Sequence, residues 1–471
     1  MANSALGGPS LGIALVLVIQ LSGVSPVWAQ PDVTTIGGSP SSETAPLSLL
    51  EQPAGAAASQ PAVEPPAAEK KAGPPPFDLR TSKRMTGDWG GVRTWMDDRG
   101  IDFSMVYVPV FQQNFYGGLD THNAQDFNGD LRINLNLDLE KMKLIPGGFF
   151  FVRGKSSYNN GIQSATGSMS LSSYAIAAGD EEFFLDKWWY GQRFFKDKIE
   201  LRFGKLLTPV DLFDTNVYAG NPWDQFMNSY LNQNPTAPHR KAFGAYLKIK
   251  PTDLFYFSTA AIDADEPNAN RCWSTDVALH GPAHYIGFWE FGLTPSLKTP
   301  KGPLPGNYRV GFNYDPRPLP VFQPPTTPAV GLRSHADDVG FYLSFDQLAW
   351  KENDDPKDKQ GLGLFCRYGF AHQDINRITN FYSIGASYTG LIPKRDKDVL
   401  AFGMADADLS HKLRHDVNPL ADREAVYEVY YGIQVTPWCI ISPDFQLIVN
   451  PGGNRDAHDS LVGGIRAKIT L

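Results

Sequence analysis

Polar side chains alternate with aliphatic ones through the segment DLRINLNLDLE, residues 130–140. Arg132, Asn134, Asn136 and Asp138 share one parity, and a two-residue period places them on one face of a β-strand, opposite the leucines. Side chains of these types exchange hydrogen bonds reversibly with water or a polar solute. Two alternatives follow for the fold. In a soluble sheet the leucines form a core, whereas in a membrane barrel they face lipid and the polar row lines a pore.

From residue 30 onward the sequence lacks the motifs of common catalytic and metal sites. It has no G-x-S-x-G elbow, H-E-x-x-H helix, phosphate-binding Walker loop or paired-Cys zinc spacing. The nine His are scattered, mostly in predicted loops. We therefore expect no catalytic residue, no bound metal and no cofactor. A net charge of -8 without a basic run argues against nucleic acid as a partner.

Residues 1–29 have the features of an export signal. The apolar run LGIALVLVIQLSGV, residues 11–24, is too short to span a bilayer comfortably, and Val27 and Ala29 suit the -3 and -1 positions of a cleavage site. The segment before the run carries no Lys or Arg, which is atypical of export signals. We predict a cleavable signal peptide and an exported chain that begins near Gln30.

Two segments separate this signal from the first predicted strand. Residues 30–80 are dominated by Pro, Ala, Ser and Gly and are predicted to be a disordered linker, acting either as a contact with peptidoglycan or as a simple spacer. Residues 81–102 are predicted to form a short amphipathic helical segment, because Trp89, Val92 and Trp95 recur at helical offsets and Gly100 can end the helix. This segment plugs the barrel, braces it or lies at its rim.

Residues 103–471 are predicted to form an all-β domain. Aromatic residues make up 12% of the chain, which suits many short strands, and no later segment has the ~18 consecutive apolar residues of a membrane-spanning helix. The alternation test finds about 16 strands. They lie near residues 103–111, 131–140, 148–157, 183–194, 198–206, 243–250, 254–262, 284–293, 308–314, 339–347, 362–372, 380–389, 398–406, 424–436, 440–449 and 461–471.

The connections between these predicted strands alternate in length. The links that hold KMKLIPGG, KPTDL and TPWCI are short, whereas those near 207–242 and 263–283 are long. Short turns at one rim and long loops at the other are typical of an outer-membrane barrel, and a soluble sandwich has no reason to show them. The link from Gln347 to Gly361 is an exception, being long for its predicted side. We predict a transmembrane antiparallel β-barrel in the cell outer membrane.

Several motifs together resemble one family. They are TGDWGGVR (86–93), LRFGKLLTP (201–209), GLFCRYGFA (363–371), SYTGLIPKRDKDVLAFG (387–403) and YEVYYGIQVTPWCIISPDFQLIVNPGG (427–453). In this order they resemble the OprB-type carbohydrate-selective porins, and the resemblance covers about residues 86–471. It implies a 16-stranded outer-membrane barrel that admits small carbohydrates by diffusion. The Pro/Ala-rich linker and the terminal Leu471 depart from the pattern of the family.

Strand parity predicts which side chains line the channel. Arg, Asn, Gln, Asp and Glu exchange hydrogen bonds with sugar hydroxyls, and an aromatic ring can stack on an apolar sugar face. Each of these side chains has the alternative role of simply solvating the wall. The predicted lumen residues are Arg132, Asn134, Asn136, Asp138, Arg153, Lys155, Arg202, Arg309, Arg367, Glu424, Glu428, Tyr430 and Gln434.

The long segment 221–241 is the best candidate for a loop that folds inward to narrow the channel. Its candidate sugar contacts are Trp223, Asn232, Asn234 and Arg240, which have the alternative role of packing the loop. The outward faces suit outer-membrane lipid or a homotrimer interface equally well. A rival hypothesis is a barrel that does not transport but anchors the envelope or binds surfaces.

The three cysteines are too few for a disulfide scaffold. The predicted topology puts Cys272 in an outer loop, Cys366 on an outward face and Cys439 in a turn at the opposite rim. We therefore expect no intramolecular disulfide.

Overall fold

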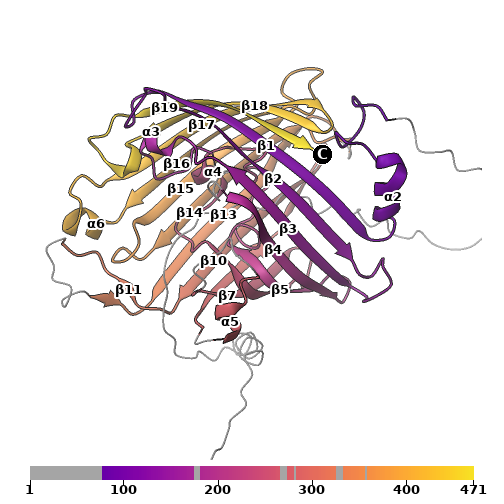
Figure 1. Cartoon of the computed structure of the whole chain (residues 1–471), viewed down its shortest axis with the longest axis horizontal. Coiled ribbons are helices and arrows are strands. Elements are labelled where there is room, and N and C mark those ends of the chain that lie inside the picture. The colour runs from indigo at the N-terminus through magenta and orange to yellow at the C-terminus, as the bar shows by residue number, and fades with distance from the viewer. Residues whose placement is uncertain (1–76, 174–180, 266–272, 281–282, 325–332, 356–357) are drawn as a thin grey trace, which may run out of the picture.

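The computed structural model describes residues 77–471 except 174–180, 266–272, 281–282, 325–332 and 356–357. The predicted signal peptide, nearly all of the predicted linker and Cys272 lie outside the described residues. The main body is a single antiparallel barrel (Figure 1). Its first eight strands are β1 (Ile101–Tyr116), β2 (Gln125–Asp138), β3 (Gly148–Tyr158), β4 (Glu181–Phe194), β5 (Ile199–Thr208), β6 (Arg240–Ile249), β7 (Phe255–Asp263) and β8 (Tyr285–Leu293). The remaining wall strands are β10 (Gly302–Asp315), β13 (Asp338–Lys351), β14 (Gly361–Ala371), β15 (Ile378–Thr389), β16 (Val399–Leu409), β17 (Arg423–Thr436), β18 (Cys439–Val449) and β19 (Ser460–Thr470).

The barrel is closed by its first and last strands. Successive wall strands pair antiparallel, and β1 pairs with both β2 and β19. The short β9 (Ser296–Thr299) follows β8 and pairs with the same partner, β10, so the wall is sixteen strands around. Closure satisfies the backbone groups that an open sheet edge would leave unpaired in lipid. The predicted fold class and strand number are confirmed, and every predicted strand overlaps an observed one.

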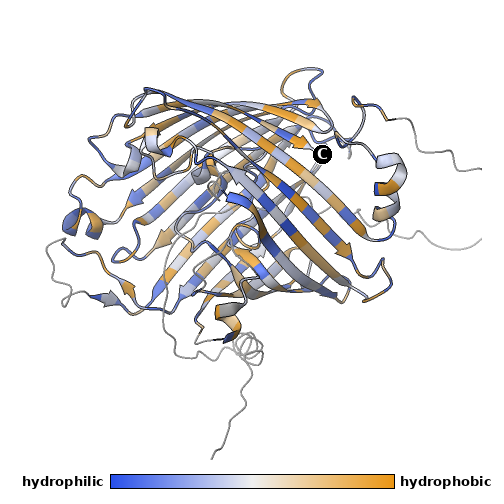
Figure 2. Ribbon diagram, in the orientation of Figure 1, coloured by the Kyte–Doolittle hydropathy of each residue, from blue (hydrophilic) through white to orange (hydrophobic). Residues whose placement is uncertain are grey.

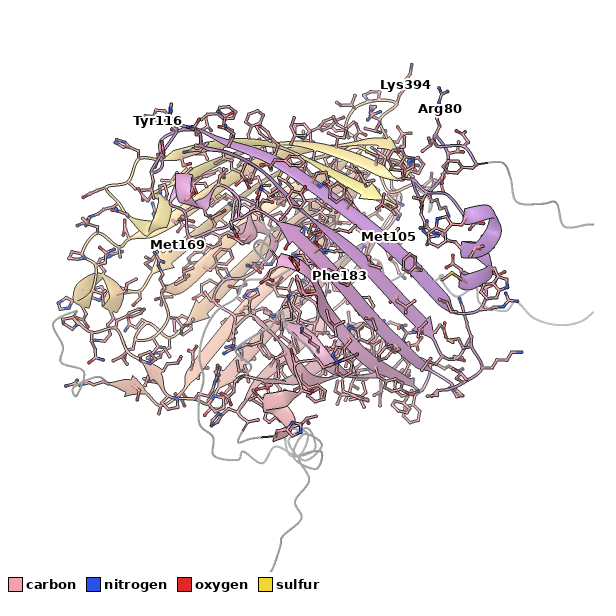
Figure 3. All side chains as sticks on the ribbon, viewed as in Figure 1. Arg80, Met105, Tyr116, Met169, Phe183 and Lys394 are labelled. Carbon is pink, nitrogen blue, oxygen red and sulfur yellow. The ribbon has the colours of Figure 1, made fainter. Side chains whose placement is uncertain are left out.

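The two ends of the barrel differ in the length of their connections. The turns at residues 195–198 and 437–438 lie at the end where the chain enters β1 and leaves β19, whereas residues 209–239 join β5 to β6 at the other end. Figure 3 shows Arg80 and Lys394 at the short-turn end and Tyr116 at the long-loop end. The short-turn end of an outer-membrane barrel faces the periplasm. The exceptional link is shorter than predicted, because β13 continues to Lys351 through a bulge between Leu348 and Trp350.

Hydropathy alternates along the wall strands (Figure 2). On β16, Leu400 and Phe402 are exposed on the outer face, whereas Ala401 and Ala405 are buried on the lumen side. On β2, Arg132 and Asn134 are buried on the lumen side, opposite the leucines. The apolar residues therefore face outward, as in a barrel whose solvent is lipid.

The segment before β1 contains only a short helix. A 3-10 turn, η1 (Trp89–Gly91), leads into α2 (Val92–Asp97), so the helix is shorter than the predicted segment 81–102. The segment lies at the rim of the barrel, beside the periplasmic end of β1 (Figure 1). Gly100, with φ +82°, makes the sharp turn into the strand.

The other helices of the described residues are short and lie in the connections. They are α3 (Gln163–Thr166), α4 (Ser229–Asn232), α5 (Asp276–His280), α6 (His411–Asp416) and the 3-10 turn η4 (Pro451–Gly453). The loop between β10 and β13 carries a small hairpin of β11 (Leu319–Pro320) and β12 (Ser334–His335). Within the described ranges no helix has the length and apolar character to cross a membrane. Cys366 and Cys439 are free thiols.

Candidate functional site

The lumen is narrowed by residues 209–239, the constriction loop, which fold inward from β5 and return to β6. Phe213, Phe226 and Leu231 of this loop are fully buried against the inner wall. Phe226 contacts Phe365 and Tyr430 edge-on, with ring centroids 5.6 and 5.1 Å apart, and Phe213 stacks on Phe288 at 5.5 Å. The apolar core of the protein thus lies inside the barrel, between the constriction loop and the wall.

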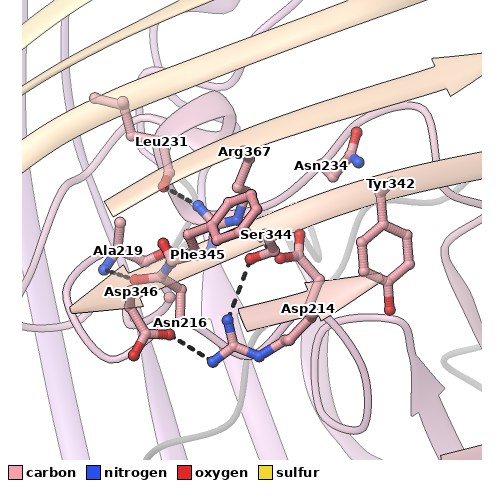
Figure 4. A network of polar contacts seen from close by, with 12 residues as sticks. Asp214, Asn216, Ala219, Leu231, Asn234, Tyr342, Ser344, Phe345, Asp346 and Arg367 are labelled. Carbon is pink, nitrogen blue, oxygen red and sulfur yellow. Dashed lines mark hydrogen bonds and ion pairs between the residues drawn. The ribbon is translucent and has the colours of Figure 1, made fainter. Parts of the chain in front are cut away.

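Arg367 of β14 fixes the middle of the constriction loop (Figure 4). Its Nε donates to Asp214 Oδ1 at 3.1 Å, while Nη1 and Nη2 donate to the carbonyl oxygens of Leu231 at 2.9 Å and Ala219 at 2.5 Å. Asn216 adds a bond from Nδ2 to the Phe345 carbonyl at 3.1 Å. A guanidinium presents donors in a rigid fork, so one side chain can hold two separate stretches of the loop.

Strands β17 and β19 hold the far side of the constriction loop. The Glu428 carboxylate accepts the backbone N–H groups of Met227 and Asn228, the latter at 2.9 Å. Arg466 donates to the carbonyl oxygens of Pro222 at 2.7 Å and Gln225 at 2.6 Å. These charged side chains bond to backbone groups, so they fix the path of the loop whatever its side chains are.

A second loop, which leaves β3 and is described up to residue 173, folds in above the first. Glu424 of β17 accepts the N–H groups of Met169 at 2.7 Å and Ser170 at 2.8 Å. The two loops also bond to each other, because Ser229 N donates to Leu171 O and Leu171 N donates to Ser229 Oγ, both at 2.9 Å. Glu424 and Glu428 share one face of β17, so a single strand holds both loops.

Glycines on the lumen face of the wall make room for the constriction loop. A Cβ at Gly363 would lie 2.1 Å from the Tyr218 ring, and one at Gly369 would lie 2.4 Å from the Asn234 side chain. Larger residues at these wall positions would push the loop away from β14.

Charged side chains of β2, β3, β4 and β6 line another part of the lumen. We call this part the basic wall. Arg132 donates to Asp130 at 2.6 Å, and its guanidinium carbon lies 3.3 Å from the ring centroid of Trp223 in the constriction loop. Lys155 lies 3.2 Å from the same carboxylate of Asp130. Arg153 donates to Asn134 Oδ1 at 2.6 Å. Trp223 is therefore one point at which the constriction loop meets this wall.

A β-bulge adds two charges to the basic wall. The register between β3 and β4 shifts after Arg153, so that the consecutive residues Asp186 and Lys187 are both buried. Asp186 pairs with Lys241 of β6 at 2.7 Å, and Lys187 pairs with Asp211 of the constriction loop. Alternation alone misses one of these two residues. The adjacent opposite charges are the available signal, because strict parity would put one of them in lipid.

The seven charged residues named on these strands, together with Asp211 of the constriction loop, which pairs with Lys187, carry an excess of positive charge. Five are cationic and three are anionic, which gives a net charge of +2. They are Arg132, Arg153, Lys155, Lys187, Lys241, Asp130, Asp186 and Asp211.

Four of the predicted lumen residues lie in the more open periplasmic half of the barrel. Arg202 donates to Glu200 at 2.6 Å and lies over the Trp189 ring at 4.6 Å, and Asn136 donates to Asp102 at 3.1 Å. Asp138 and Gln434 are likewise half-buried near this end. These side chains stay accessible to water below the constriction.

Five other predicted lumen residues are as deeply buried as those of the basic wall. Arg367, Glu424 and Glu428 bond to the infolded loops, Tyr430 packs on Phe226, and Arg309 donates to Asp346 at 2.5 Å and Ser344 at 3.3 Å. The described contacts of these side chains are thus with the protein itself.

Among the constriction-loop candidates, Trp223 faces the basic wall. Asn232 donates to the carbonyl oxygens of Phe226 and Asn228, and Asn234 accepts from Thr236, so both side chains bond within the loop. Arg240 is the first residue of β6.

His239, at the end of the constriction loop, is held neutral. Burial lowers the pKa of its imidazole to about 4, and a bond to the Ala237 backbone opposes this only in part. Its buried Nε2 has no hydrogen-bond partner among the described residues. Protonation of His239 is therefore unfavourable while the loop is packed.

Proteins with the same architecture include known porins. A solved structure of Pseudomonas putida OprB superposes with a TM-score of 0.72 at 22% sequence identity, covering 84% of this chain and all of that one. Porin B of Pseudomonas aeruginosa is 24% identical over 83% of this chain and 92% of its own length. The putative porin QuiX of Acinetobacter baylyi is 20% identical over 82% of this chain and 93% of its own length.

The family follows from the extent of one match. Residues 122–471 match the model of the carbohydrate-selective porins called the OprB family, which is most of the barrel and more than half of the chain. The match includes the constriction loop, the basic wall from Arg132 onward and every wall strand that holds the loop. The chain therefore belongs to the OprB family of carbohydrate-selective porins, the barrels of the outer membrane that act as channels.

Proposed function

We propose that the chain conducts small carbohydrates passively through the lumen and that the constriction loop and the basic wall together select them. The observation that supports this most is the meeting of Trp223 with Arg132 at the level where the infolded loop narrows the barrel. A solute that crosses the lumen must pass this level, where it loses much of its hydration and meets side chains that donate and accept hydrogen bonds.

The chemistry of the basic wall suits a neutral polyol. Sugar hydroxyls both donate and accept, so they can exchange bonds with Arg153 and Asn134 in turn as they leave water. Four of the five cations already have carboxylate partners, at Asp130, Asp186 and Asp211. Each contact with a solute is therefore weak, which lets the solute leave as readily as it binds.

The side chains of the lumen fall into three proposed roles. Arg132, Asn134, Arg153, Lys155 and Trp223 are the proposed sugar contacts of the narrow level. Asn136, Asp138, Arg202 and Gln434 are proposed to hydrate the sugar again on the periplasmic side. Arg367, Glu424, Glu428 and Tyr430 are proposed to act by positioning the loops that they contact, and Arg309 by bonding to Asp346 of the neighbouring wall strand.

Processing and assembly are part of the proposal as well. Residues 1–29 are proposed to be removed as a signal peptide on export, which the apolar run and the small residues Val27 and Ala29 support. We also propose that the outward apolar faces form the interface of a homotrimer and that residues 30–80 contact peptidoglycan.

Planar-bilayer recording tests the proposed function directly. The purified barrel should conduct ions, and adding a monosaccharide to the bath should reduce that current reversibly, because a sugar in the narrow level displaces hydrated ions. Correctly folded protein that gives no conductance, or a current that sugars leave unchanged at any concentration, would contradict the proposal.

A further inference from the structure

Residues 77–100, which we call the rim segment, run along the rim at the periplasmic end of the barrel before β1 begins. Met85 N donates to the Thr470 carbonyl at 2.8 Å, and the Trp438 indole N–H donates to the Leu79 carbonyl at 2.6 Å. Arg84 pairs with Asp102 at 3.5 Å. The rim segment is therefore fixed to the seam where β19 meets β1, and Figure 1 shows α2 outside the lumen.

One side of this fixed segment is apolar and uncovered. Trp89 of η1 is 41% exposed, and Val92 and Trp95, which are neighbours on α2, are 48% and 52% exposed. The other side of α2 carries Arg93, which is buried beneath Trp89 and donates to the Gly87 carbonyl at 3.1 Å. Two exposed tryptophans and a valine in one ridge need an apolar or interfacial neighbour.

The outer face of the barrel has an aromatic girdle near its periplasmic end, but the girdle has a gap. Outward aromatic residues there include Tyr190, Phe203, Phe257, Phe291, Tyr308 and Tyr388. The strands at the seam between β19 and β1 carry mainly aliphatic residues at the same level. Their outward residues nearest this end are Cys439 and Ile441 on β18, Ala467 and Ile469 on β19, Ile101 and Phe103 on β1, and Leu135 and Leu137 on β2.

The exposed ridge stands at this gap. Phe103 is the one aromatic among those seam residues, and the Trp89 ring packs against it at a centroid distance of 5.8 Å. The apolar ridge of the rim segment is thus continuous with the lipid-facing wall through Phe103. Tryptophan prefers the interfacial region of a bilayer, where its ring is shielded and its N–H stays hydrated.

We propose that the rim segment is an interfacial anchor in the inner leaflet of the outer membrane. Trp89, Val92 and Trp95 enter the boundary between phospholipid headgroups and acyl chains and complete the girdle that the seam strands lack. The exposed cations Arg80, Lys83 and Arg99 of the same segment fit the lipid phosphates. The guanidinium carbon of Arg99 lies 4.4 Å from the ring centroid of Trp95. This pair therefore presents both a ring and a charge to the interface.

Site-directed spin labelling tests the anchor in the full-length protein. Cys272, Cys366 and Cys439 are first replaced by Ala, and the background protein is shown to conduct normally. Nitroxides are then placed by Val92→Cys and Trp95→Cys, with Asp98→Cys, at the exposed polar residue that caps the C-terminal end of α2, as the control. Each protein is reconstituted in phosphatidylethanolamine and phosphatidylglycerol vesicles. Labels at 92 and 95 should be more accessible to oxygen than to a water-soluble nickel complex, and the label at 98 should show the reverse.

Three results would overturn the proposal. Nickel accessibility at positions 92 and 95 equal to that at 98 would place the ridge in water. Spin–spin broadening that disappears on dilution with unlabelled protein would place it against a second copy of the chain. Labels inaccessible to both reagents would place it against the barrel. In each case conductance should match that of the background protein, because the segment lies outside the lumen.

Discussion

The residues of the basic wall, with Asp211, carry a net charge of +2 beside the constriction loop, so we expect the channel to favour anions. Paired charges on the lumen wall can bias which solutes enter the channel without binding any of them tightly. Rings of charge act on ions through space, whereas neutral sugars respond mainly to the hydrogen-bonding groups. Ion selectivity and sugar passage should therefore respond differently to the same substitution.

The substitution Arg132→Gln should weaken the preference for anions. A unit charge about 10 Å from an ion in water contributes about 0.4 kcal/mol, which changes the local concentration of each ion about twofold. The reversal potential in a KCl gradient measures this preference, and it should move toward the potassium potential. Arg423→Gln, on the outer face, is the matched control and should leave the potential unchanged. Equal shifts in both variants would mean that Arg132 does not face the conduction path.

The substitution Arg367→Leu should destabilise the barrel interior. Removing the guanidinium leaves Asp214 and two carbonyl groups buried without their donor, and breaking a buried ion pair from one side costs about 3–5 kcal/mol. The midpoint of thermal unfolding in detergent should fall relative to that of Arg423→Leu. Open-channel current noise should rise as well, because the loop would fluctuate. An unchanged midpoint would show that the loop does not depend on this side chain.

His239 should make the constriction loop less stable in mild acid. The pKa of the imidazole is about 4 in the folded protein against an ordinary value of 6.5. The unfolded loop therefore binds a proton at higher pH than the folded loop does. Stability is full above about pH 6.5, falls as the pH drops toward 4 and changes no further from this group below that. Protease cleavage of the loop should increase from pH 7 to pH 5 in the original protein, less so in His239→Gln, and His458→Gln should behave like the original.

At the scale of elements, strand β17 connects the wall to both infolded loops. Glu424 and Glu428 lie four residues apart on its lumen face, and they accept backbone N–H groups from the two loops. A buried N–H that loses its acceptor costs about 1–3 kcal/mol. Each carboxylate is thus worth more to the loop than one ordinary hydrogen bond.

The substitution Glu428→Ala should widen the passage. Met227 and Asn228 lose their shared acceptor, so this part of the constriction loop should leave the wall. In liposome swelling assays the rate for a disaccharide should rise relative to that for a monosaccharide. Val429→Ala, the next residue on the same strand but facing lipid, provides the control. A ratio that stays constant in Glu428→Ala would contradict the positioning role.

Sequence alone predicts the wall far better than the interior. A strand between lipid and lumen must alternate apolar and polar residues. In a strand such as β2 this alternation predicts both the outward and the inward face. The anchoring roles of Arg367 and Glu428 escape parity, because a polar residue that points inward looks the same whether it meets water or a folded loop. The bulge at Asp186 and Lys187 cannot be predicted from parity either, since a bulge breaks the two-residue period of the strand.

At the scale of the whole molecule, the barrel is a sugar channel with its core inside. A wide barrel filled only with water would pass most small solutes. The infolded loops restrict which solutes can pass. The same closed sheet supplies the lipid-facing exterior, the anchors of the loops and the basic wall. The rim segment at the periplasmic end adds a proposed contact with lipid that does not touch the channel.

Liposome swelling with a panel of solutes of similar size measures whether the constriction loop and the basic wall select carbohydrates. If they do, vesicles containing the protein should swell faster with neutral monosaccharides than with an amino acid of comparable mass, and replacing residues 215–235 by a short Gly-Ser linker should remove this preference while increasing all rates. Equal rates for sugars and amino acids in the original protein, or a preference that survives removal of the loop, would contradict this selection.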